Sequence, residues 1–260
     1  MTVTYSSYLK VDELLKLQQP LSDGPEHDEM LFIVIHQVYE LWFREMLHEL
    51  DFLKERMLAN DGPRSLATLK RVLTILKVNV AQIDVLETMT PRDFLSFRAR
   101  LESGSGFQSY QFRELEFVLG HKQRSALDRY DRGTVGRERL EKRFGEATVW
   151  DAFLALLARR GHAVPAALLK RDVTRSIEPS TALQAVLVEV YRRDTETLAF
   201  CERLTDLDEG LQEWRYRHVK MVQRTIGSKP GTGGSAGAAY LMTTLNHPLF
   251  PDLWEIRSQL

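Results

Sequence analysis

The chain has 260 residues, 43% hydrophobic and 27% charged, so it is long enough to bury a large core and is neither collagenous nor a disordered tract. Lys and Arg (35) nearly balance Asp and Glu (36), and a net charge of −1 gives no strong general attraction to nucleic acid or an anionic membrane. The one cysteine, Cys201, excludes an internal disulfide, the first ten residues lack a signal-peptide pattern, and no apolar run approaches the roughly 20 residues that cross a bilayer. We therefore expect a cytoplasmic protein with no membrane span and no nucleic-acid partner.

Helical periodicity dominates the first half of the chain. Residues 27–60 contain no Gly or Pro, and their apolar side chains recur at helical spacing. Residues 64–89 repeat that pattern, and a Thr-Pro pair then supplies the N-cap and first-turn proline of a helix toward residue 101. The glycines of 102–106 end this helix, and helical spacing resumes over 107–119.

The second half continues the helical pattern with more interruptions. Residues 124–145 are charged and irregular, which indicates short exposed helices or loop, whereas 149–159 predicts a compact amphipathic helix. A long helical stretch follows over 181–226, with a break expected near 206–210. Alternating runs of β-branched residues are missing, so the predicted fold class is all-α.

The segment 227–237 holds five of the fifteen glycines. It is either a solvated linker or a backbone that approaches a ligand closely, and the residues alone leave both readings open. No internal repeat or heptad run appears, so we expect one helical bundle domain over 1–260.

Two familiar motifs fail on inspection. Glu45 and His48 have the Glu-x-x-His spacing of di-iron bundles, but no second copy exists in the sequence. Residues 231–236 carry the letters of a dinucleotide fingerprint, yet they follow a helical segment rather than a strand.

Three polar residues within apolar helical segments remain as candidates. His36 lies in a strongly apolar segment, where a hydrogen-bonded core histidine is the competing interpretation. His218 lies on the helix that leads into the glycine-rich segment, where a helix-end histidine favoured by the dipole competes. Arg98 follows Phe94 by four residues, so a guanidinium group and an aromatic ring share one helix face. Such a pair suits an aromatic ligand that bears a carboxylate, and a surface cation–π pair is the competing interpretation.

Five ordered blocks give the chain its family resemblance. They are Tyr5-Ser-Ser-Tyr-Leu9, the segment from His27 through Trp42, Ser105-Gly-Phe-Gln-Ser109, Trp214-Arg-Tyr-Arg-His218 and Gly231-Thr-Gly-Gly-Ser235. With these blocks the chain resembles the tryptophan 2,3-dioxygenase family, from about Thr4 to nearly the C-terminus.

The resemblance implies a helical homotetramer that binds haem b without a covalent link, in the ferrous form when active. His218 matches the proximal ligand of the haem iron, and Ser105 and Gly106 match a loop beside the haem. The implied reaction inserts both atoms of O2 across the indole 2,3 bond of L-tryptophan, giving N-formyl-L-kynurenine in tryptophan catabolism by the kynurenine pathway.

The resemblance also implies the substrate contacts. His36, the candidate catalytic residue, matches the histidine that hydrogen-bonds the indole N–H, and we assign it no obligatory role as a base. Arg98 matches the partner of the substrate carboxylate, and Thr232 a contact with the amino-acid end. The remaining matches are an apolar wall around the indole and an N-terminal segment that reaches a neighbouring subunit's pocket: Phe32, Phe94, Tyr5, Tyr8 and Leu9.

One block departs from the family pattern. Residues 102–106 read Glu-Ser-Gly-Ser-Gly where many members read Gly-Pro-Ser-Ser-Gly, which bears on loop mobility and substrate range. Two alternatives therefore stand beside the dioxygenase: a natural-product homologue that oxidises a substituted tryptophan, by insertion of one oxygen atom in some relatives, and a non-catalytic haem or indole sensor.

Overall fold

The computed structural model describes residues 2–24, 26–102, 104–232, 237–245 and 247–260. Within these ranges the regular structure consists of helices, with no strand, which confirms the all-α prediction. Ser103 and residues 233–236, which belong to the two glycine-containing segments, lie outside the described residues.

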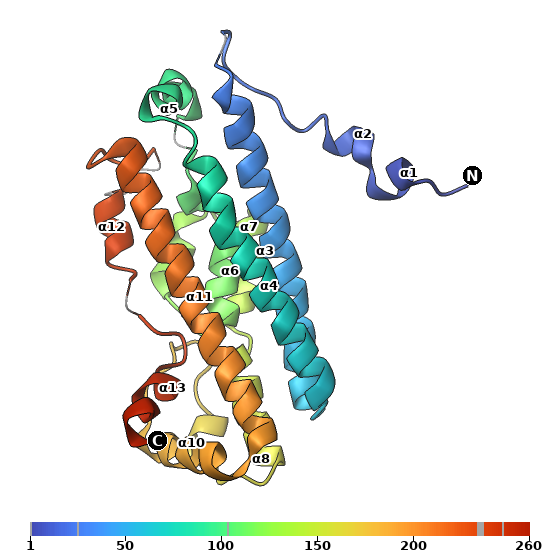
Figure 1. Cartoon of the computed structure of the whole chain (residues 1–260), viewed down its shortest axis with the longest axis vertical. Helices are drawn as coiled ribbons and strands as arrows, with labels where there is room; N and C mark the ends of the chain where they lie inside the picture. Colours follow the sequence, from blue (N-terminus) through green and yellow to red (C-terminus); the bar gives the residue numbers. More distant parts are fainter. Residues whose placement is uncertain (1, 25, 103, 233–236, 246) are drawn as a thin grey trace.

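Three long helices lie side by side and form the frame of the molecule (Figure 1): α3 (Asp28–Leu58), α4 (Gly62–Leu86) and α11 (Thr195–Ile226). The helices expected over 27–60 and 64–89 are confirmed. Asp61 caps α4 by accepting a hydrogen bond from the Arg64 N–H, and a proline occupies its first turn.

The break expected near 206–210 is wrong. The helix α11 runs through that segment without interruption, and the chain breaks instead at Asp194, between α10 (Thr181–Arg193) and α11. The Asp194 side chain accepts a hydrogen bond from the Thr197 N–H at 3.0 Å, so this residue starts the new helix as its N-cap.

Gly210 has a packing role inside α11. A Cβ atom at this position would come within 2.8 Å of Leu76 Cδ2, so the missing side chain allows α11 to pack closely against α4. Gly210, which lies in the segment where a break was expected, therefore marks a helix contact.

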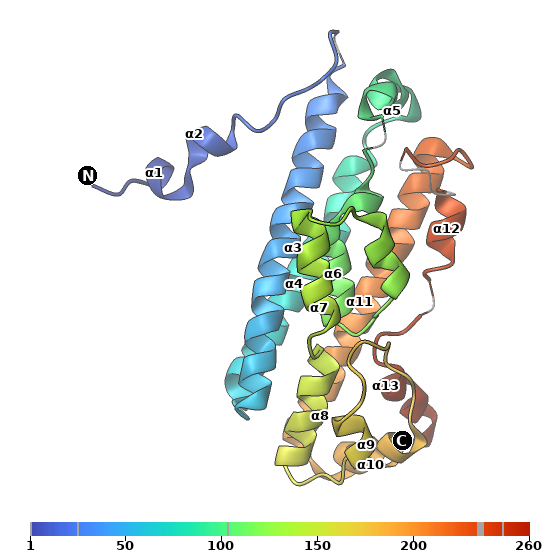
Figure 2. The same cartoon turned by 180° about the vertical axis from the view of Figure 1, so that it is seen from behind.

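Shorter helices surround the frame (Figure 2). Besides α10, they are in chain order α1 (Tyr5–Leu9), α2 (Val11–Leu14), α5 (Pro91–Phe97), the 3-10 turns η1 (Arg98–Leu101) and η2 (Gly106–Gln108), α6 (Tyr110–Val118), η3 (Arg124–Arg129), α7 (Val135–Phe144), α8 (Val149–Arg159), α9 (Ala166–Leu169), α12 (Ala238–Met242), α13 (Pro251–Glu255) and η4 (Ile256–Gln259).

Most of the shorter segments follow the sequence predictions. The helix over 149–159 and the short helices within 124–145 are confirmed. The helix expected toward residue 101 is α-helical only to Phe97 and then tightens into η1, and the one expected over 107–119 begins as η2. None of the helices in the described ranges combines the length and the apolar composition that crossing a bilayer requires.

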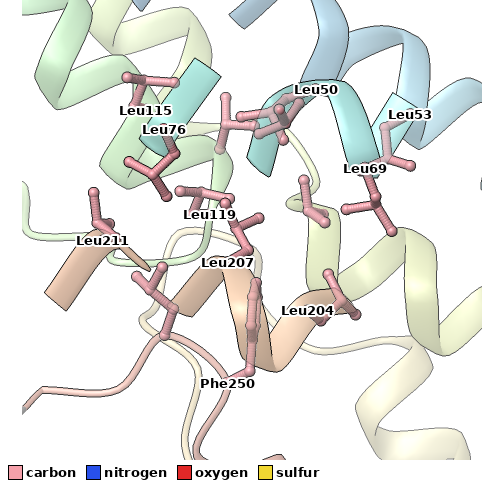
Figure 3. Packing of buried hydrophobic residues seen from close by; sticks show 14 of the residues in the cluster. Leu50, Leu53, Leu69, Leu76, Leu115, Leu119, Leu204, Leu207, Leu211 and Phe250 are labelled. Carbon is pink, nitrogen blue, oxygen red and sulfur yellow. The ribbon is translucent and has the colours of Figure 1, made fainter. Parts of the chain in front are cut away.

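A leucine-rich core (Figure 3) packs the lower half of the bundle. This is the end drawn at the bottom of Figure 1, where the C-terminal half of α3 meets the N-terminal half of α11. Leu50, Leu69, Leu204 and Phe250 converge there from different elements, and each is fully buried. Asp208 adds a polar anchor, because its Oδ2 accepts hydrogen bonds from the backbone N–H groups of residues 249 and 250 and from the indole N–H of residue 254. The C-terminal segment is thereby tied to α11.

The N-terminal segment leaves this compact body (Figures 1 and 2). Neither α1 nor α2 contains a buried residue, although the segment is rich in apolar side chains. Tyr5 is 77% exposed and Tyr8 76% exposed, so the aromatic rings of α1 lack intramolecular packing.

Candidate functional site

A pocket opens between the N-terminal half of α3 and the C-terminal half of α11, beside α5 and the described part of the glycine-rich segment. It encloses about 240 Å³. Eight of the eleven residues singled out in the sequence line it: Phe32, His36, Phe94, Arg98, Ser105, Gly106, His218 and Thr232. The fold therefore brings together residues that are up to 200 positions apart (Phe32 to Thr232).

His218 enters the pocket from α11 as a neutral imidazole. Burial lowers its pKa to about 4, with His36 as a second cause, so the ring carries a lone pair at neutral pH. It makes no hydrogen bond to any described residue, and its partial exposure is to the pocket. An unpaired neutral imidazole in such a place is a ready ligand for a metal centre.

His36 enters the same pocket from α3 with a fixed tautomer. Its Nδ1 lies 2.7 Å from the carbonyl oxygen of Phe32, and because a carbonyl oxygen only accepts, Nδ1 carries the proton. Burial lowers the pKa of His36, more than the Phe32 hydrogen bond and Glu40 raise it. The remaining ring nitrogen, Nε2, is therefore an acceptor without a proton.

Aromatic rings form the wall beside His36. The ring centroids of Phe32 and His36 are 4.1 Å apart, and those of Phe32 and Phe94 are 5.8 Å apart. Phe97, which is fully buried, packs edge-on against both phenylalanines. The result is an apolar recess with one hydrogen-bond acceptor at its side, which suits a flat aromatic group bearing an N–H.

Hydrogen bonds between two loops cross the mouth of the pocket. Arg98 donates from Nη2 to the carbonyl oxygen of Pro230 at 2.6 Å, and Thr232 donates from Oγ1 to the carbonyl oxygen of Gly104 at 2.6 Å. Each bond joins the segment after α5 to the glycine-rich segment after α11. The described part of 227–237 therefore approaches the pocket closely, as the ligand-binding reading of this segment requires.

A buried charge cluster lies at another wall. Glu116 accepts hydrogen bonds from Arg113 at 2.5 Å and from Arg215 at 2.8 Å, and all three residues line the pocket. Burial alone would raise the pKa of Glu116, but the two guanidinium groups outweigh it and lower the pKa. Two arginines thus pair with one carboxylate at this wall, and Glu40 adds a second carboxylate to the pocket lining.

Three residues of the sequence prediction lie away from this pocket. Tyr5, Tyr8 and Leu9 are exposed on α1 and do not line it. This placement leaves the prediction that they serve a neighbouring subunit untested.

The Glu-x-x-His pair set aside in the sequence also lies elsewhere. His48 is exposed on α3, and Glu45 lines a shallow groove on the outer face of α3 and α4. No group of three or more His, Cys, Asp or Glu side chains in the described ranges is arranged to hold a metal ion.

Sequence reasoning missed two parts of the site. Trp214 stacks on His218 with an angle of 3° between the ring planes, and the i, i+4 spacing on one helix was a signal for that contact. Glu116 and Arg215 are 99 positions apart, and nothing in the sequence pairs them.

The fold and the site define a class of protein: an all-α protein with an apolar pocket into which two neutral imidazoles project from different helices.

The family model described as tryptophan 2,3-dioxygenase matches residues 1–159 and 135–260. Among similar proteins named tryptophan 2,3-dioxygenase, that of Herpetosiphon aurantiacus is 59% identical over 99% of this chain and 98% of its own. Those of Anaeromyxobacter sp. and Caulobacter vibrioides are 56% and 44% identical over 99% of this chain and 96% and 98% of their own. The chain belongs to the tryptophan 2,3-dioxygenase family.

Proposed function

We propose that the chain is a haem-dependent tryptophan 2,3-dioxygenase that converts L-tryptophan and O2 to N-formyl-L-kynurenine, in tryptophan catabolism by the kynurenine pathway. Identity of up to 59% to proteins of that name over nearly the whole chain carries the proposal. The pocket supports it, because a neutral imidazole, an aromatic recess and an arginine are the groups that a haem, an indole and a carboxylate need.

The pocket residues fit a haem group. His218 offers an unpaired nitrogen, and the wall around it is largely apolar, with Phe43, Ile83 and Leu86 among its members. Covalent attachment through a Cys-x-x-Cys-His motif is excluded, because the one cysteine, Cys201, is buried in the hydrophobic core. We therefore propose haem b, with His218 as the proximal ligand and Ser105 and Gly106 beside it.

Bound haem iron, in the ferrous state, supplies the binding and activation of O2. The chain's own residues bind and orient the substrate. In our proposal the indole ring packs against the wall formed by Phe32 and Phe94, and its N–H donates to Nε2 of His36. Because Nδ1 of His36 already donates to the Phe32 carbonyl, the imidazole cannot turn its protonated nitrogen toward the indole without losing that bond.

The amino-acid end of the substrate would be held at the mouth of the pocket. Arg98 gives a carboxylate two parallel hydrogen bonds, which a lysine would not. The Pro230 carbonyl that now accepts from Arg98 is neutral, so a substrate carboxylate is the stronger partner and would replace it. Thr232, on the glycine-rich segment, would close over the amino group and keep water from the reacting bond.

We propose a homotetramer in which the N-terminal segment completes the neighbouring pocket. The exposed apolar side chains of α1 support this, because Tyr5 and Tyr8 are more than three-quarters exposed and Leu9 is 46% exposed. A groove on the outer face of α3 and α4, lined by Leu41 and Trp42 among others, offers a further apolar surface to a second copy. The reduced, buried thiol of Cys201 suits a cytoplasmic enzyme.

Isotopically labelled O2 tests the reaction. Protein reconstituted with haem, reduced and given L-tryptophan should yield N-formylkynurenine that carries both labelled atoms, because three contacts on one substrate leave it little freedom to escape after the first transfer. Product with a single labelled atom on an intact indole-derived ring would replace the dioxygenase by the monooxygenase alternative. Haem binding without turnover would favour the sensor.

A further inference from the structure

The two imidazoles of the pocket are held in different ways. His36 is fixed by the hydrogen bond from its Nδ1 to the Phe32 carbonyl. His218 has no such bond to any described residue, although a histidine that binds a metal usually donates its second ring N–H to an acceptor. Since the ring torsion of histidine is broad, another contact must determine the plane of the His218 ring.

Trp214 makes that contact. It lies one helical turn before His218, its ring is 5.2 Å from the imidazole between centroids, and the two planes are parallel to within 3°. Rotation of the imidazole about its Cβ–Cγ bond would break this stack. The indole face thus restricts the Cβ–Cγ torsion of His218, as the hydrogen bond to the Phe32 carbonyl restricts that torsion in His36.

Packing in turn fixes Trp214. Phe112 lies 4.9 Å from its ring centroid, and Tyr39 and Phe43 meet it nearly edge-on at 6.2 Å. The indole Nε1 is buried, and the Tyr39 hydroxyl lies near it, since Trp214 acts to lower the pKa of Tyr39 against the larger rise caused by burial. Three helices, α3, α6 and α11, therefore contribute to the orientation of one imidazole.

We propose that Trp214 is a positioning residue: its stack on His218 sets the plane of the imidazole that would bind the haem iron. This inference rests on the proposed function, in which His218 binds the haem iron. It assigns to an aromatic face the role that a hydrogen-bonded carboxylate or carbonyl has in other metal-bound histidines.

Proton NMR of the cyanide-bound ferric holoprotein tests the inference, because the spread of the paramagnetically shifted haem-methyl signals depends on the orientation of the axial imidazole plane. We compare wild type with Trp214→Phe, which keeps an aromatic face, and Trp214→Leu, which removes it. Trp254→Leu is the matched control, since Trp254 lies on α13 and does not line the pocket. Haem transfer to excess apomyoglobin gives an independent rate.

The methyl pattern should shift strongly in Trp214→Leu and little in Trp214→Phe, and it should stay unchanged in Trp254→Leu. Haem loss should accelerate about 10–100-fold in Trp214→Leu, the usual effect of removing a group that orients a metal ligand. An unchanged methyl pattern in Trp214→Leu with haem bound overturns the inference.

Phe112→Leu keeps the test decisive if Trp214→Leu does not fold. This variant loosens Trp214 and leaves His218 itself unchanged. Because Phe112 also lines the pocket, a smaller shift of the methyl pattern together with faster haem loss supports the inference, and an unchanged pattern overturns it. The proposed function fails separately: in that case the wild-type protein binds no haem, or His218→Ala keeps the wild-type axial-ligand spectrum.

Discussion

The two halves of α11 differ in how completely they are packed. In the first half, Leu204 and Leu207 are fully buried in the leucine-rich core. In the second half, Trp214, His218 and Ile226 face the pocket. Hydrogen bonds between the segment after α5 and the glycine-rich segment connect the chain at the mouth of this pocket. A single helix thus anchors its N-terminal half by apolar packing and presents His218 to the pocket from its C-terminal half.

The largest effect should come from His218→Ala, in the pocket half. The variant should lose most of its haem and essentially all activity, yet stay helical by circular dichroism because His218 contributes nothing to the leucine-rich core. Haem content by absorption spectroscopy is the measurement. A variant with full haem and an unchanged spectrum contradicts the assignment of the proximal ligand.

Arg98→Ala should weaken catalysis without unfolding the leucine-rich core. Loss of a charged hydrogen-bond partner at a binding site costs roughly 2–5 kcal/mol, so kcat/KM for L-tryptophan should fall by at least tens of fold. Tryptamine, which lacks the carboxylate, is the control and should be affected much less. Equal proportional losses with both substrates would remove the carboxylate role.

Leu207→Ala should show the opposite pattern. A fully buried leucine truncated to alanine costs about 2–5 kcal/mol of unfolding free energy, which denaturant titration measures. The KM of the folded fraction should remain that of wild type, because Leu207 does not line the pocket. A large change in KM with little loss of stability would mean that the two halves of α11 are not separable.

Removal of residues 1–9 tests whether the pocket half is complete within one subunit. If Tyr5, Tyr8 and Leu9 complete a neighbour's pocket, activity should fall about 10- to 100-fold while the lower core keeps its stability. Analytical ultracentrifugation gives the assembly state in parallel. A shortened chain that is tetrameric and fully active would refute the contribution of the N-terminal segment.

Asp194→Ala should have the smallest effect, about 0.5–2 kcal/mol of stability, because it removes the N-cap of α11. Burial alone would raise the pKa of Asp194, but hydrogen bonds from Thr197 and His162 lower it to about 2. A carboxyl with a depressed folded-state pKa stabilises the fold above its unfolded pKa near 3.8, and this contribution is lost as the pH falls toward 2. Thermal unfolding at pH 6 and at pH 2 measures it: the gap between wild type and Asp194→Ala should narrow at the lower pH.

Local sequence predicted helices correctly where the residue pattern within one helix was sufficient. The amphipathic repeats predicted the long helices α3 and α4, and Thr-Pro predicted the capped start of α5. The break expected near 206–210 was wrong, because Gly210 in that segment makes a close helix contact, and the neighbour that shows this, Leu76, is 134 positions away in α4.

The sequence by itself determined the all-α class, and through the resemblance it named His36, His218 and Arg98 before their surroundings were known. Only the tertiary structure decided the tautomer of His36, the stack of Trp214 on His218 and the pairing of Glu116 with two arginines. The physical reason is that helix periodicity is a local property of the backbone. Burial, proton placement and ring orientation instead depend on which atoms from distant segments come within a few ångströms, and packing of the whole chain sets those neighbours.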